Sequence, residues 1–386
     1  MPSSHPDPAI QMVDLRSQYL AIKDEVDSAI QGVLDTTAFI GGPVVGEFEC
    51  KLAGYLDIPF VHGVANGTDA LQVAMMALGV GPGDEVITTA FTFIATAEAA
   101  ALLGAVPVFA DIDPLTYNID PARIEELITE RTKAIVPVHI FGQPADMDPI
   151  LAIAQKHGIP VIEDNAQGVG STYKGKRTGA LGTCGTLSFF PSKNLGCYGD
   201  GGAVLTRDEA LYHRMKLIAN HGSARKYHNE VVGINSRLDA MQAAILKVKL
   251  DHLDAYSAAR VKAADQYDAL FAGDQAIVTP YRDPNCSHVF HQYTLRITNG
   301  SRDALEAHLK ALKIPNAVYY PVPLQRLPVF AEGGARWGDL SHTNKAADEV
   351  ISLPMHTELT DAQLTYIASA VIEGVHQGTA AAVESA

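Results

Sequence analysis

Short apolar segments alternate with helix-like segments between about residues 60 and 205, and this alternation constrains the fold more than any other feature of the chain. Helical composition is seen at residues 95–103 and 150–157. The segments predicted as strands are residues 86–89, 106–111, 134–140, 160–163 and 186–190. Short strands separated by helices are typical of a mostly parallel sheet with helices on both faces. Because ligands of such sheets collect at the carboxyl ends of the strands, we expect functional side chains there.

The second half of the chain has a different pattern. Residues 238–272 form one long helical stretch, which we expect to connect two domains. Beyond it we predict strands at 292–297 and 317–320, a helix at 302–312 capped by Ser301, and a final helix capped by Thr360. The sequence therefore predicts an α/β fold with a large domain over residues 10–255 and a smaller α+β domain over residues 256–386.

Charge and composition exclude several classes of protein. The chain of 386 residues has a formal net charge of −15, which argues against a nucleic-acid partner. It has no apolar run long enough to span a membrane, and the polar segment Met1–Ala9 lacks the apolar core of a signal peptide. The four cysteines are far apart and show no metal-ligand spacing. We therefore expect a cytoplasmic protein with reduced thiols and without a metal site.

Two segments place polar groups where they are able to bind a ligand. Gly67, Thr68 and Asp69 precede the apolar run 70–78 and read as a helix start, whose free N–H groups and dipole favour an anion. Asp164 follows a predicted buried strand, where a carboxylate is able to bind a metal, a ribose or a protonated ring nitrogen. The alternative for both segments is a plain helix cap.

A third segment carries a lysine in an apolar setting. Lys193 lies in "LSFFPSKNLG", and its Phe, Pro, Leu and Gly neighbours indicate partial burial, which lowers a lysine pKa and frees a nucleophilic amine. The alternative is a solvated surface lysine. An anion-binding helix end, a strand-end acid and a buried lysine together suit pyridoxal phosphate. Phe93 adds an aromatic ring that is able to lie against the cofactor.

These segments resemble the DegT/DnrJ/StrS family of nucleotide-sugar aminotransferases, pyridoxal-phosphate enzymes of fold type I. The resemblance runs from about Val13 to Ile372. It is carried by "FIGGPVVGEFE", "NGTDALQVAMMALGVGPGDEVITTAFTFIATAEA", "VIEDNAQ", "SFFPSKNLGCYGDGGAV", "NHG" and "GINSRLDAMQAAIL". Related sugar dehydratases have histidine in place of Lys193, so the lysine indicates an aminotransferase.

The resemblance implies a role for each matching residue. Lys193 matches the Schiff-base lysine, and Asn235 matches a residue that reaches the cofactor phosphate of a neighbouring subunit, which implies a homodimer with shared active sites. The other implied cofactor contacts are Asp164 at the ring nitrogen, Gln167 near the phenolic oxygen, Phe93 on the ring face, and Gly67, Thr68, Asp69 and Ser188 at the phosphate.

The C-terminal strings "HVFHQYTLRI", "AVYYPVPLQRLPVF" and "SLPMH" resemble the branch that aminates C3 of UDP-2-acetamido-3-keto-glucuronic acid for bacterial surface polysaccharides, with glutamate as the expected donor. Arg237 is the candidate partner of the sugar carboxylate, and His291 and Tyr320 are candidate substrate contacts. The alternatives are a surface arginine, a packed histidine and a core-edge tyrosine. Two rival functions remain: amination of a dTDP-linked 3-keto-6-deoxy sugar, and a non-enzymatic regulatory or binding role.

Overall fold

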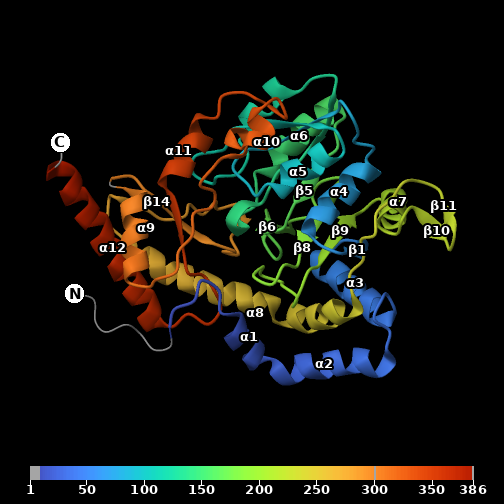
Figure 1. Ribbon diagram of the computed structural model, residues 1–386, viewed down its shortest axis with the longest axis horizontal. Helices are drawn as coiled ribbons and strands as arrows, with labels where there is room; N and C mark the ends of the chain where they lie inside the picture. The colour runs from blue at the N-terminus through green and yellow to red at the C-terminus, as the bar shows by residue number, and fades with distance from the viewer. Residues whose placement is uncertain (1–8, 300, 385–386) are drawn as a thin grey trace.

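A computed structural model describes residues 9–299 and 301–384. The centre of the fold is a large sheet made of two groups of four hydrogen-bonded strands (Figure 1). Its strands are β1 (Phe60–Val64), β2 (Glu85–Thr89), β3 (Val106–Ala110), β4 (Thr132–Ile135), β5 (Ile162–Asp164), β8 (Cys184–Ser188), β9 (Gly202–Thr206) and β15 (Arg336–Trp337). The ladders run β1–β9–β8–β5 and β15–β3–β2–β4, and single parallel bridges from Ile135 to Val161 and from Val138 to Asp164 join them. The expectation about the N-terminus concerns residues that lie almost wholly outside the described ranges.

Most neighbouring strands are parallel, as the sequence predicted, and β9 is the exception. β2 is parallel to β3 and β4, and β5 is parallel to β8. β9 is antiparallel to both β8 and β1. A parallel connection needs a crossover, usually through a helix. The segment between β8 and β9 contains no helix, so the chain turns back beside the strand that it has just left. This returning segment carries Lys193.

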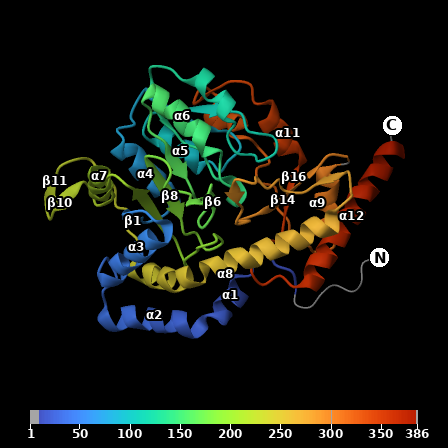
Figure 2. The same ribbon diagram turned by 180° about the vertical axis from the view of Figure 1, so that it is seen from behind.

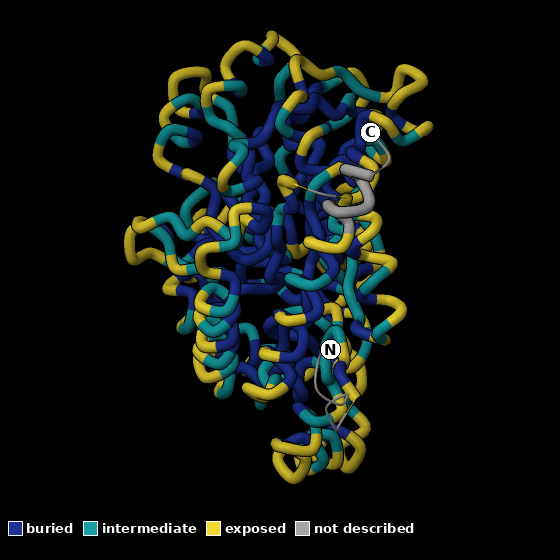
Figure 3. The backbone as a smooth tube through the Cα atoms, turned by 90° about the vertical axis from the view of Figure 1, so that its left-hand side faces the viewer, coloured by how far each residue is buried: buried dark blue, intermediate teal, exposed yellow. Residues whose placement is uncertain are grey.

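Helices cover both faces of the sheet because successive strand residues point to opposite sides. In β9, Val204 packs in the cluster with α4 (Gly67–Ala77), α5 (Ala95–Leu102) and α7 (Glu209–Ala219), whereas its neighbours Ala203 and Leu205 pack on the other face. That second face is covered by α3 (Pro43–Leu56), α6 (Met147–His157) and the first half of α8 (Ala240–Phe271). The sheet therefore lies in the buried interior of the molecule (Figure 3).

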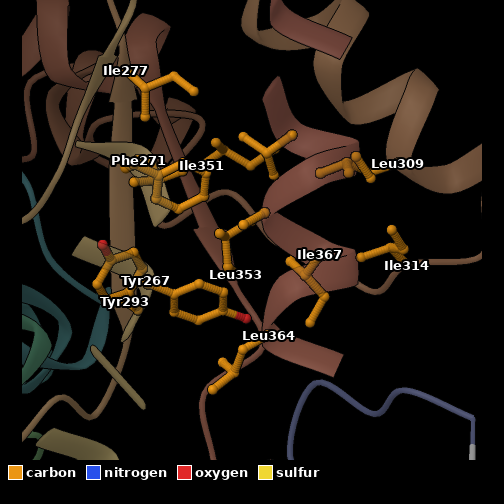
Figure 4. Close-up of a cluster of buried hydrophobic side chains, with 14 of the residues drawn as sticks. Tyr267, Phe271, Ile277, Tyr293, Leu309, Ile314, Ile351, Leu353, Leu364 and Ile367 are labelled. Carbon is orange, nitrogen blue, oxygen red and sulfur yellow. The ribbon is translucent and has the colours of Figure 1, made fainter. Parts of the chain in front are cut away.

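The C-terminal part builds a second core around an antiparallel sheet. Its strands are β12 (Ile277–Val278), β14 (Tyr293–Ile297) and β16 (Val350–Leu353), and its helices are α9 (Arg302–Ala311) and α12 (Asp361–Glu384). Tyr267 and Phe271 of α8 pack into this core, so the long helix belongs to both units (Figures 1 and 4). The predicted caps are confirmed, because Ser301 accepts a hydrogen bond from Ala304 N and Thr360 accepts one from Gln363 N.

Shorter elements complete the chain: α1 (Leu15–Ala21), α2 (Lys23–Thr36), β6 (Thr172–Tyr173), β7 (Lys176–Arg177), β10 (Ser223–Arg225), β11 (His228–Asn229), β13 (Cys286–Ser287), α10 (Pro328–Ala331) and α11 (Ser341–Glu349). Within the described ranges, no helix is long and apolar enough to cross a membrane.

One predicted strand is wrong, and the C-terminal part returns to the large sheet. Of residues 317–320, only Ala317 bridges a strand residue, Ser352. Val318, Tyr319 and Tyr320 instead pack against a cluster that includes Phe91, because the chain here crosses toward the large sheet. It then forms α10, whose Phe330 packs in one cluster with Ala97 of α5, and β15 pairs in parallel with β3. Ala346 and Ala347 of α11 pack with Phe91, and in the view of Figure 2 α11 lies between α6 and β16. The division at residue 255 stays a prediction.

Candidate active site

The loop after β8 holds Lys193 in an enclosed position. Its backbone N–H donates to Phe190 O at 2.8 Å, and the next residue, Asn194, is buried and donates from its side chain to Val289 O at 3.0 Å. Burial lowers the pKa of Lys193 to about 8, although the Asp164 carboxylate opposes this by favouring the cation. A substantial share of this amine is therefore neutral near neutral pH and able to act as a nucleophile.

Asp164 ends β5 and is 4% exposed. Its Oδ2 accepts a hydrogen bond from Thr96 Oγ1 at 2.7 Å, and its Oδ1 accepts one from Ala166 N at 3.2 Å. Asp164 is not followed directly by a helix, since the next helix in the described chain is α7, so Asp164 is not a helix cap. Both donors are neutral groups, so they orient the carboxylate without forming an ion pair with it, and the carboxylate is able to bind a cationic partner.

The preceding residue, Glu163, points to the opposite side of the sheet and is fully buried. It lies 2.9 Å from His139 Nε2 and accepts hydrogen bonds from the N–H groups of Gly179, Leu181 and Gly182 at 2.6–2.7 Å. His139 Nδ1 accepts from the Ala145 N–H group, so its Nε2 carries a proton toward Glu163. These bonds fix the end of β5, which carries Asp164.

A cradle for an anion lies where α4 begins. Asn66 caps the helix, since its side chain accepts from Asp69 N at 2.8 Å. Gly67 faces Ser188, because a Cβ on Gly67 would lie 2.7 Å from Ser188 Cβ and 3.1 Å from its Oγ. A side chain at position 67 would therefore fill this space. Thr68 is half-buried in the same first turn, whose free N–H groups favour an anion.

Gln167 connects the site to the C-terminal part of the chain. Its Oε1 accepts from Phe141 N at 2.7 Å, and its Nε2 donates to the hydroxyl of Tyr320 at 3.1 Å. Burial raises the pKa of Tyr320, so the hydroxyl keeps its proton. Because that oxygen already accepts from Gln167, its own hydrogen remains available to a ligand.

Phe93 lies just before α5, and its carbonyl accepts from Thr96 N, whereas His291 lies near Lys193. The Phe93 side chain is 58% exposed, so its ring is open to a flat ligand. His291 is buried, and its pKa is lowered by burial and by the positive charges of Lys193 and Arg260. Its Nδ1 has no hydrogen-bond partner in the described part of the chain. Arg260 donates to His291 O at 3.3 Å and so fixes the backbone there.

Asn235 and Arg237 are placed apart from this group. Both are exposed, and within the described ranges neither has a hydrogen bond or ion pair to the residues around Lys193. Arg237 lines a separate groove of about 720 Å³ that also contains Arg214 and Lys216. Ser236, which lies between them, accepts a hydrogen bond from Ala65 N at 3.0 Å, one residue before the cap of α4.

Sequence reasoning did not identify Asn66 or Thr96. Asn66 is a preferred capping residue immediately before the Gly-Thr-Asp turn, so its type was the available signal. Thr96 is far from Asp164 in sequence. Only the order of strands β2, β4 and β5 brings the helix after β2 close to the end of β5.

Comparison with known proteins agrees with this geometry. The sequence profile of the DegT/DnrJ/EryC1/StrS aminotransferase family matches residues 20–372. The chain is 51% identical to the UDP-2-acetamido-2-deoxy-3-oxo-D-glucuronate aminotransferase of Pseudomonas aeruginosa, over 94% of this chain and 99% of that protein. It is 50% identical to the pleiotropic regulatory protein of Geobacillus stearothermophilus, over 94% of this chain and 98% of that protein.

A solved structure shows the same fold over nearly the whole chain. A crystal structure of S. venezuelae DesV in complex with a ketimine intermediate superposes with a TM-score of 0.91 at 40% identity, covering 94% of this chain and 98% of DesV. The chain is therefore a member of the DegT/DnrJ/EryC1/StrS aminotransferase family, whose aminotransferases use pyridoxal phosphate.

Proposed function

We propose that this aminotransferase moves an amino group from glutamate to C3 of UDP-2-acetamido-3-keto-glucuronic acid. The observation that carries the enzymatic part is the convergence of the Lys193 amine and the Asp164 carboxylate beside the Gly67–Ser188 cradle. When bound, pyridoxal phosphate supplies an electron sink and a carrier for the amino group. The choice of sugar rests on the P. aeruginosa relative, which is named for that keto-uronate.

The residues of the cradle and the strand ends fit that cofactor. Gly67, Thr68 and Asp69, with the Ser188 hydroxyl, would hold the phosphate at the start of α4. Asp164 would face the ring nitrogen, since the two hydrogen bonds that its carboxylate accepts come from neutral donors, Thr96 Oγ1 and Ala166 N. Gln167 would lie near the phenolic oxygen, and Phe93 would cover one face of the ring.

Lys193 would hold the cofactor covalently through its side-chain amine and, once released, would move a proton as general base and acid. Its pKa of about 8 suits both directions, because a proton carrier works best when its pKa is near the working pH. The Tyr320 hydroxyl and the ring of His291 border the same space and would contact the sugar substrate. His291 would act there as a neutral group, since burial and the nearby cations lower its pKa.

A homodimer with shared sites would bring Asn235 and Arg237 into the chemistry. Both are exposed, and Arg237 lines a groove together with Arg214, Lys216 and one acidic residue, Glu230, on a chain of net charge −15. In the dimer, Asn235 would reach the neighbour's cofactor phosphate, and Arg237 would pair with the carboxylate of the sugar.

The test is a substrate panel with the purified protein. UDP-2-acetamido-3-keto-glucuronic acid, the same sugar without its carboxylate, and a dTDP-linked 3-keto-6-deoxy sugar are each incubated with glutamate, and the amino-sugar product is quantified by mass spectrometry. The proposal expects the uronate to be aminated most efficiently. Preference for the dTDP-linked sugar would transfer the substrate assignment to that rival.

A regulatory role is the second candidate, because the G. stearothermophilus relative is named as a regulatory protein. The set of Lys193, Asp164 and Ser188 favours the enzyme, since binding alone does not require a half-buried lysine with a lowered pKa. Conversion of glutamate to 2-oxoglutarate by the loaded protein, in amounts equal to the cofactor, would decide for catalysis. Complete absence of that half-reaction would favour regulation.

A further inference from the structure

The Asp164 carboxylate is oriented by a side chain that comes from a different element. Thr96 lies in the first turn of α5, is 1% exposed, and donates from Oγ1 to Asp164 Oδ2 at 2.7 Å. Among the described residues, the other oxygen accepts one hydrogen bond, from the Ala166 N–H group, at the longer distance of 3.2 Å. The hydrogen bond from the threonine hydroxyl is therefore the shorter of the two that orient this carboxylate.

The chemical nature of this donor matters as much as its position. A lysine or arginine at the same place would also orient the carboxylate, but it would neutralise the charge. A hydroxyl donates one hydrogen bond and leaves the negative charge on Asp164. The Thr96 side chain is 1% exposed, and a β-branched side chain on a helix has few χ1 rotamers, of which the one in the structure directs the hydroxyl at Asp164.

We propose that Thr96 is a positioning residue of this enzyme, whose hydroxyl aims the Asp164 carboxylate at the ring nitrogen of the cofactor while leaving its charge intact. The proposal rests on the cofactor site of the proposed function. It predicts that the Thr96 hydroxyl strengthens the binding only of a ligand that places a protonated ring nitrogen opposite Asp164.

The test uses the cofactor-free protein and measures the Kd of two probes by equilibrium dialysis. One probe is pyridoxal phosphate, and the other is its analogue with C–H in place of the ring nitrogen. Thr96→Val keeps the shape and removes the hydroxyl. We expect it to weaken pyridoxal phosphate binding about tenfold, the lower end of what a hydrogen bond to a charged group contributes, and to leave the Kd of the analogue unchanged. Thr96→Ser should restore the wild-type Kd for pyridoxal phosphate.

Thr88→Val is the matched control. Thr88 is equally buried on β2, and its hydroxyl donates at 2.8 Å to a neutral group, the Val136 carbonyl. This variant loses the same kind of bond without touching Asp164, so it should bind both probes as the wild type does. If Thr96→Val does not fold, Thr96→Cys replaces it, because a thiol is a weak donor and should give an intermediate Kd.

The outcomes separate cleanly. Equal binding of pyridoxal phosphate by Thr96→Val and wild type would overturn the proposal. So would an equal loss for both probes, or an equal loss in Thr88→Val, because each would show a general structural effect. If the wild-type protein itself failed to bind pyridoxal phosphate, the cofactor site of the proposed function would fall, which is a result distinct from any difference between variants.

Discussion

The lowered pKa of Lys193 predicts an unusual reactivity in the cofactor-free protein. Burial brings this pKa from 10.5 to about 8. At about pH 7, roughly 10% of the amine is then neutral, against about 0.03% for a fully solvated lysine, which is an enrichment of roughly 300-fold. The neutral amine is the form that reacts, so Lys193 should be acylated far more readily than solvated lysines at equal access.

Competitive acetylation measured by peptide mass spectrometry, repeated from about pH 6 to about pH 11, would give the titration of each lysine. Lys193 should show a midpoint near 8. Lys174, which pairs with Asp148 and has its pKa raised to about 12, is the opposite reference within the same chain. In Asp164→Asn the Lys193 midpoint should fall further, since the carboxylate favours the cation. A Lys193 midpoint above about 10 would refute the reasoning.

Four further outcomes follow from the same site. In the cofactor-free protein, Lys193→Met should raise the free energy of unfolding by about 1–3 kcal/mol near pH 7, because the folded state disfavours the Lys193 cation. Urea titrations at a series of pH values would measure this gain. It should vanish between about pH 8 and about pH 10.5, because in that window the Lys193 amine is protonated in the unfolded chain but not in the folded one. Asp164→Asn should reduce the transamination rate by on the order of a hundredfold or more, and a rate within about twofold of wild type would contradict its role at the ring nitrogen. Mixed dimers of Lys193→Ala and Asn235→Ala subunits should be active although neither parent is, whereas a fully active monomer in sedimentation would exclude shared sites. Arg237→Met should raise KM for the uronate by roughly tenfold to a hundredfold and barely change that for a neutral keto-sugar; equal losses would make Arg237 structural.

The sequence predicted five strands of the central sheet because they are short apolar runs with clear boundaries, and it did not predict β1, β9 or β15. It placed Lys193 just after a strand and a helix start at Gly67 from residue types alone, but it did not predict that the segment with Lys193 turns back into the antiparallel strand β9. It overextended the strand predicted at 134–140, whose ladder ends at Ile135. Pro137 has no N–H group to donate to a neighbouring strand, so only single bridges continue beyond that end.

What the sequence did not indicate are contacts between residues far apart in the chain. Tyr320 was expected in a strand of the small domain, yet its segment crosses to the large sheet and reaches Gln167. β15 consists of only Arg336 and Trp337, which carry no apolar run and therefore no strand signal. A strand this short is stabilised by the neighbouring strand with which it pairs, here β3, and that pairing is known only once the fold is known.

The position of β15 affects how readily the protein aggregates while it is being synthesised. Val108 and Phe109 of β3 pair with a strand that begins at Arg336, whose guanidinium also binds the buried Glu85 carboxylate at 3.0 Å. During synthesis, the N-terminal part of the sheet leaves the ribosome long before this strand does. Until then the edge of β3 presents unpaired N–H and C=O groups, a template for pairing with another chain. The nascent protein is thus prone to edge-to-edge pairing after the rest of its large sheet has formed and before Arg336 and Trp337 have been added, and chains truncated before residue 336 retain that open edge.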